Sequence, residues 1–89
     1  MADLYSKRFG KPVWVTHHAR ESMGRRGVDM ATLATLLEQG AIKRTDESHL
    51  WIYMDIPGRT DNLICAAAVE QAAVVIKTVM INWELEDEL

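Results

Sequence analysis

The apolar residues of this chain change their spacing at Gly40, and this change limits the fold to a combination of helices and a sheet. Just before Gly40 the apolar residues recur at intervals of three and four, which places them on one face of a helix. These residues are Met30, Leu33, Ala34 and Leu37. From Ala41 onwards, apolar residues alternate with polar ones or form short unbroken runs, which is typical of strands. We therefore expect helices in the first half of the chain and a sheet in the second.

The first half carries the capping residues of two helices. Thr16 is a good N-cap for a helix that ends at Arg26, because its hydroxyl can accept a hydrogen bond from a backbone N–H of the first turn. Asp29 is expected to cap a second helix that ends at Gln39. A glycine follows each helix and is expected to end it. We expect the second helix to face the core and to carry no site.

Four strands are predicted after Gly40, at residues 41–45, 49–56, 63–69 and 74–83. The last two are almost continuously apolar, so we expect central strands covered on both faces, by helices on one and by a tail or a partner on the other. Proline, glycine and aspartate predict a tight turn at residues 57–61. Residues 12–16 are expected to form a short strand or an extended entry to the first helix, with the proline at an edge or a strand start. The predicted fold is α+β, with two N-terminal helices packed on one face of an antiparallel sheet of about four strands in meander order.

The length of 89 residues suits one domain with a single two-layer core. Residues 1–11 are polar and basic and are expected to be loose. Four of the 13 acidic side chains lie in the last six positions, so residues 84–89 form an acidic tail. This tail is either a solvated end or a segment that meets a basic site or a basic partner.

No stretch of the sequence is apolar enough for a membrane span, and the N-terminal residues do not have the apolar core of a signal peptide. We therefore expect a cytoplasmic protein without membrane contact. The one cysteine, Cys65, cannot form a disulfide within the chain, which agrees with a reducing compartment.

The segment Thr16 to Val28 concentrates the residues that can take part in chemistry. Residues four apart share a helix face, so His18, Ser22 and Arg26 line up on one side of the first helix, with Arg25 at the edge. Histidine titrates near neutral pH and can transfer protons, and an arginine can hold a phosphate with two parallel hydrogen bonds. This face can serve an anionic ligand, or it can be the solvated side of a surface helix.

The same helix resembles a known motif, H-A-x-x-R-M-x-x-R-G-[IV], of a widespread prokaryotic family of small proteins described only as a domain of unknown function. The matching residues are His18, Ala19, Met23, Arg26, Gly27 and Val28. Ser22 stands where that family usually has its first arginine. The likeness extends from about Trp14 to Trp83, and its helix-helix-sheet order is similar to that of RelE-type and BrnT-type toxins of toxin–antitoxin pairs. This resemblance implies a metal-independent ribonuclease with a cognate antitoxin as partner.

RNA cleavage without a metal needs an acid, a base and cations where charge grows on the phosphate. His18 is the candidate acid or base, and Arg26 is the candidate phosphate ligand. The resemblance adds Thr78, which matches a threonine in the last-strand block of the family. Trp51 or Tyr53 can stack on a base. The residues predicted to bind substrate are Arg25, Arg44, Tyr53 and Lys77.

Two classes of function remain open. The first is a ribonuclease that acts on RNA through His18 and the arginines. The second is a non-catalytic module, such as an inactive relative, an inhibitor or a homodimer, that binds a protein through its sheet or its acidic tail. The acidity of the chain and Ser22 favour the second class, whereas the rest of the helix motif favours the first.

We predict neither a metal site nor a cofactor. Adjacent His17 and His18 point about 100° apart on a helix, and a single cysteine provides no thiolate pair at the spacing of a zinc site. The sequence also contains no P-loop and no dinucleotide-binding fingerprint.

Overall fold

The computed structural model describes residues 2–55 and 63–83, and these form two helices and one sheet. The strands are β1 (Leu4–Ser6), β2 (Lys11–Val15), β3 (Ala41–Arg44), β4 (His49–Met54), β5 (Leu63–Glu70) and β6 (Val74–Trp83). The helices α1 (His17–Arg26) and α2 (Met30–Gln39) lie between β2 and β3 in the chain. The predicted turn at 57–61 and the acidic tail at 84–89 lie outside the described residues.

The sheet has six strands in the order β1-β2-β6-β5-β4-β3, so the predicted antiparallel meander of about four strands is wrong. β2 pairs with β6 in parallel, with Val13 opposite Val74, and the other neighbours are antiparallel. The additional strands come from the N-terminal end, where residues 1–11, expected to be loose, contain β1. The β2–β6 pairing joins segments far apart in the sequence, so no local pattern predicts it.

Both helices have the predicted N-caps. The Thr16 hydroxyl accepts a hydrogen bond from the Ala19 backbone N–H at 3.1 Å, and the Asp29 carboxylate accepts one from the Thr32 N–H at 2.8 Å. Gly27 follows α1 with φ 68, the left-handed conformation that glycine adopts at least cost.

Gly40 ends α2 for a different reason, because its backbone is extended, with φ −70. A Cβ at this position would lie 2.6 Å from the Leu36 carbonyl oxygen and 2.9 Å from Ile52 Cγ2. Gly40 is therefore required by the close approach of α2 to β4.

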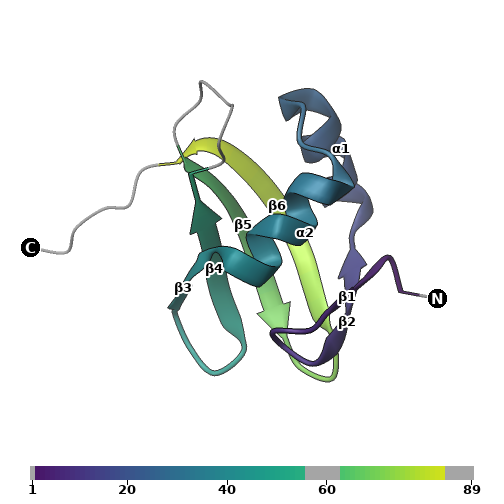
Figure 1. Ribbon diagram of the computed structural model, residues 1–89, viewed down its shortest axis with the longest axis vertical. Helices are drawn as coiled ribbons and strands as arrows, with labels where there is room; N and C mark the ends of the chain where they lie inside the picture. Colours follow the sequence, from purple (N-terminus) through teal and green to yellow (C-terminus); the bar gives the residue numbers. More distant parts are fainter. Residues whose placement is uncertain (1, 56–62, 84–89) are drawn as a thin grey trace, which may run out of the picture.

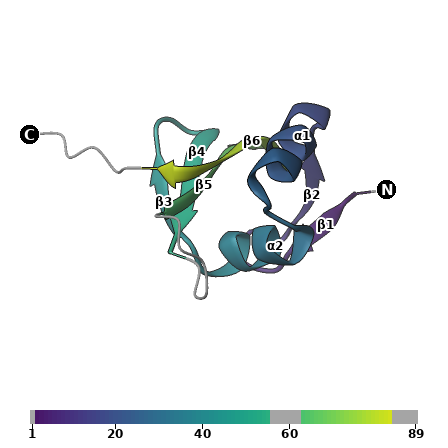
Figure 2. The same cartoon turned by 90° about the horizontal axis from the view of Figure 1, so that it is seen from above.

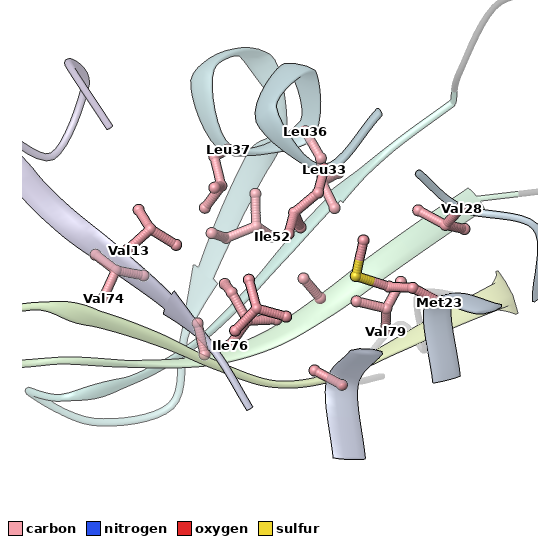
Figure 3. Close-up of a cluster of buried hydrophobic side chains, with 14 of the residues drawn as sticks. Val13, Met23, Val28, Leu33, Leu36, Leu37, Ile52, Val74, Ile76 and Val79 are labelled. Atoms are coloured by element: carbon pink, nitrogen blue, oxygen red, sulfur yellow. The ribbon is translucent and has the colours of Figure 1, made fainter. Parts of the chain in front are cut away.

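The core lies between α2 and one face of the sheet, the core face. Figure 2 shows the sheet curling around α2. In Figure 3, Leu33 and Leu36 of α2 lie over Ile52, while Met23 of α1 lies beside Val79. The buried residues of the core face are Val13, Val15, Leu50, Ile52, Ile64, Ala66, Ala68, Val74, Ile76 and Val79. Burial of each of the larger aliphatic side chains contributes roughly 1.5–3 kcal/mol.

The opposite side of the sheet is the outer face, which carries Trp14, Trp51, Tyr53, Ala67, Val69, Val75 and Lys77. In the part of the chain that the structure describes, α1 contacts β6, and α2 contacts β1 and β4 from the core side. Figure 1 shows α2 in front of the sheet and α1 at the end of β2. No described helix therefore covers the outer face. None of the described helices is long and apolar enough to cross a membrane.

Candidate functional site

The start of α1 is attached to β6 near the beginning of that strand. The Thr16 hydroxyl donates a hydrogen bond to the Ile76 carbonyl oxygen at 3.0 Å, and the Thr16 N–H donates to the same oxygen at 3.2 Å. Thr16 directly follows β2, whose pairing with β6 reaches only to Ile76. α1 therefore continues along β6 where β2 stops, and the exposed His18 stands in the first turn at this junction.

A β-bulge in β6 lies beside the start of α1 and involves two polar residues, Lys77 and Thr78. Ile76 pairs with Ala68 and Thr78 pairs with Ala67, so Lys77 is the extra residue. In a regular strand Thr78 would share the core face with Ile76, because side chains alternate. Instead Val79 is fully buried, Thr78 is half-buried and Lys77 is exposed. The bulge thus moves Thr78 out of the core, and Lys77 remains exposed.

Thr78 meets α1 at Ser22, where the two hydroxyl oxygens lie 3.3 Å apart. Ser22 is 2% exposed, so a longer side chain at this position requires a different packing of α1 on β6. His18 precedes Ser22 by one turn on the same helix face. We call His18, Ser22, Lys77 and Thr78 the α1–β6 seam.

The two candidate arginines of α1 lie in its last turn. Arg25 is exposed, whereas Arg26 is half-buried and its Nε atom is buried. Arg26 is two turns from His18, which is about 12 Å along the helix axis. An extended polyanion reaches both residues more readily than a single phosphate does.

A hollow of about 180 Å³ opens on the outer face next to the seam. Its lining includes Thr45, His49, Trp51, Ala67, Val69 and Lys77. Ala67 pairs with Trp51 on one side and with Thr78 on the other, so a small side chain lies between larger ones and leaves the space. Lys77 lines the hollow and is also part of the seam. The hollow and the seam are therefore adjacent on the surface.

His49 at this hollow is oriented by a carboxylate. Its Nδ1 lies 3.0 Å from both oxygens of Asp46, and the Asp46 carboxylate also accepts the backbone N–H of His49 at 2.8 Å and of Ser48 at 2.9 Å. These backbone bonds, that from His49 foremost, lower the pKa of Asp46 from its usual 3.8 to about 2. Sequence reasoning did not select His49, although the D-x-x-H spacing signals the pair.

The structure does not bring all the predicted site residues to the seam. Arg44 pairs with Leu50 on the core side of β3, separated from β6 by two strands, and its guanidinium is bonded to Glu70. Glu70 also accepts a hydrogen bond from Lys11 Nζ at 2.9 Å, and Arg44 and then Lys11 lower the pKa of this carboxyl. Tyr53 is half-buried on the outer face, opposite Cys65 and one row beyond Trp51. Thr78 contacts α1 at Ser22, His18 lies one turn before Ser22, and Lys77 precedes Thr78 in β6. Arg25 and Arg26 follow along α1.

Within residues 2–55 and 63–83, no three His, Cys, Asp or Glu side chains are grouped so as to hold a metal ion. Comparisons with known proteins give no relative: no family model matches the chain, and neither a curated protein nor a solved structure does so.

Proposed function

We propose that this protein is a metal-independent ribonuclease that cleaves RNA in the cytoplasm at the α1–β6 seam. The observation that supports the proposal most is the attachment of α1 to the bulge of β6. The Thr16 hydroxyl that caps α1 lies 3.3 Å from the Lys77 carbonyl oxygen, so the helix turn that carries His18 starts beside Lys77. This closeness of the two backbone segments supports a shared site for the imidazole of His18 and the ammonium group of Lys77, which are both exposed.

The proposed reaction uses the 2′-hydroxyl of the RNA as nucleophile. A base removes its proton, the oxygen attacks the adjacent phosphorus, and the bond to the 5′ oxygen breaks to leave a 2′,3′-cyclic phosphate. The leaving 5′ oxygen takes a proton from an acid. His18 fills one of these two roles and water the other, while Lys77 stabilises the charge that grows on the phosphate. Arg25 and Arg26 bind phosphates further along the strand.

The test is cleavage of total cellular RNA by the purified protein in EDTA, together with the His18→Ala and Arg26→Ala variants. We expect cleavage by the wild type, products with cyclic phosphate ends, and loss of cleavage in both variants. Absence of cleavage by the wild type, or unchanged cleavage in both variants, would rule out this assignment.

A second candidate function is a non-catalytic module that binds a protein, for example a cognate antitoxin or a second copy of the chain. Tyr5 is 64% exposed and Trp14 is 41% exposed, and both lie on the β1–β2 end of the outer face. Tyrosine and tryptophan are enriched at protein interfaces because they combine apolar area with a polar group.

Light scattering after size-exclusion chromatography tests the homodimer, and pull-down tests another protein partner. In either case Trp14→Ser and Tyr5→Ser are expected to abolish the association. A monomer that retains no partner would argue against this second function.

A further inference from the structure

We infer that the hollow on the outer face binds one unpaired base of a single-stranded RNA, with the base stacked on Trp51 and the neighbouring phosphate held by Lys77. This inference rests on the proposed function, because it names the class of substrate that reaches the seam.

The chemistry of the hollow fits a flat ring. Trp51 provides an aromatic wall, and Ala67 and Val69 provide apolar surface. Its volume of about 180 Å³ is below the roughly 300 Å³ at which pockets for drug-sized ligands begin, so the occupant is small. Stacking of bases on aromatic side chains is a general way in which proteins hold single-stranded nucleic acid.

The charges around the hollow favour a polyanion. Lys77 belongs to its lining, and Lys43 pairs with Trp51 on the neighbouring strand β3. The Asp46 carboxylate is bonded to the ring of His49, so these two lysines are the cations that face the hollow without that partner. Among the described strand residues of the outer face there is no Asp or Glu. Protein interfaces are depleted of lysine, whereas grooves for single-stranded nucleic acid combine cations with aromatic side chains. RNA is therefore favoured over a protein as the occupant of this hollow.

The position of the hollow links it to the proposed site of cleavage. Lys77 lines the hollow, and the next residue, Thr78, contacts Ser22 on α1. A base held against Trp51 places its own phosphate near Lys77 and the adjacent nucleotide along the seam towards His18. A base in a duplex is stacked and paired, so it cannot enter the hollow without being flipped out. The inferred substrate is therefore single-stranded.

The experiment measures binding of a fluorescently labelled single-stranded RNA of ten nucleotides whose 2′-hydroxyls are methylated. This RNA cannot be cleaved, so binding is measured separately from catalysis. We expect Trp51→Ala to weaken binding by about tenfold and Trp51→Phe, which keeps an aromatic ring, to weaken it much less. Lys77→Gln is expected to lower the slope of log affinity against log salt concentration by about one. The control is Lys7→Gln, which is expected to leave binding unchanged because Lys7 is an exposed residue in the turn between β1 and β2.

Ala67→Leu tests the hollow in a second way, because the larger side chain fills it; binding is expected to fall although no charge is lost. Two results would overturn the inference: equal affinity of Trp51→Ala, Ala67→Leu and the wild type, or a duplex bound as tightly as the single strand. Self-association of the protein that Trp51→Ala abolishes would assign the surface to a protein partner instead. If the RNA binds as expected but natural RNA is not cleaved, the inferred surface stands and the proposed ribonuclease activity fails.

Discussion

Lys77 and Thr78 owe their positions to one extra residue in β6. The bulge lets Ile76 and Val79 both enter the core, so the two polar residues between them face away from it. Ser22 is small enough for α1 to approach Thr78. The bulge and the small side chain of Ser22 together let the buried Ser22 hydroxyl lie 3.3 Å from that of Thr78, while Lys77 stays exposed.

Asp46 gives the protein a measurable dependence on acid pH. Its pKa is lowered from 3.8 to about 2 in the folded protein, chiefly by the backbone hydrogen bond from His49. A carboxylate with a lowered pKa stabilises the folded state above its unfolded pKa, and this contribution is lost as the pH falls through the folded value. We expect the Tm of Asp46→Asn to decrease less than that of the wild type between pH 4 and pH 2, as measured by circular dichroism. Parallel Tm curves for the two proteins over this range would contradict the assignment.

Two glycines are expected to respond in opposite directions to the same substitution. Gly40→Ala places a Cβ 2.6 Å from the Leu36 carbonyl oxygen, so the free energy of unfolding should fall by about 1–3 kcal/mol. Gly24 lies inside α1, and a Cβ there meets nothing within 4 Å. Gly24→Ala should therefore raise the free energy of unfolding by about 0.5–1 kcal/mol. Urea unfolding of both variants measures whether each substitution raises or lowers the free energy of unfolding. Stabilisation by Gly40→Ala would show that α2 does not approach β4 as closely as described.

The two helices are capped alike but attached differently. Thr16 caps α1 and also bonds to Ile76 on β6, whereas the Asp29 side chain caps α2 through Thr32. The cap of α1 is therefore both a local helix signal and a long-range contact between α1 and the sheet.

This difference allows the attachment of α1 to be tested with matched variants. Thr16→Ala and Asp29→Ala should each lower the free energy of unfolding by about 1 kcal/mol, because each loses an N-cap. Only Thr16→Ala also removes the hydroxyl bond from the start of α1 to Ile76 and leaves the backbone N–H bond alone to hold it, so only this variant should lose most RNA cleavage at a temperature where both are folded. Equal cleavage by the two variants would mean that the attachment does not position His18.

Glu70 forms ion pairs with two other strands of the curled sheet, at the end away from α1. Its carboxylate on β5 is bonded to Arg44 on β3 and to Lys11 on β2, strands that are not neighbours of each other in the sheet. Glu70→Gln keeps the size of the side chain and removes the charge.

We expect Glu70→Gln to lower the free energy of unfolding by up to about 1 kcal/mol, since the bridging cations are partly exposed. The difference from the wild type should shrink in 1 M NaCl, because salt screens these charges. Thermal unfolding at low and high salt measures both effects, and an effect that does not depend on salt would mean that packing, and not charge, is what Glu70 contributes.

The parts of this fold that depend on nearby residues were predictable, and the parts that depend on distant ones were not. Thr16 and Asp29 cap their helices because capping is decided within one turn. The three residues of β1 are too few to show a period, and the parallel pairing of Val13 with Val74 leaves no local pattern. Likewise, Arg44 was expected to hold a phosphate, but the register with Leu50 turns it to the core side, where Glu70 binds it.

His18 is proposed to transfer a proton during RNA cleavage, and its neighbour His17 provides the control. His17 and His18 are both exposed residues of the first turn of α1. His17 is paired with Glu21 at 3.1 Å and lies about 100° around the helix from the face that carries His18 and Ser22. The most direct measurement is kcat/KM for cleavage of a single-stranded RNA in EDTA by His18→Gln and by His17→Gln. We predict a decrease of about 100-fold or more for His18→Gln and less than about threefold for His17→Gln. Equal values for the two variants would contradict the proposed role of His18.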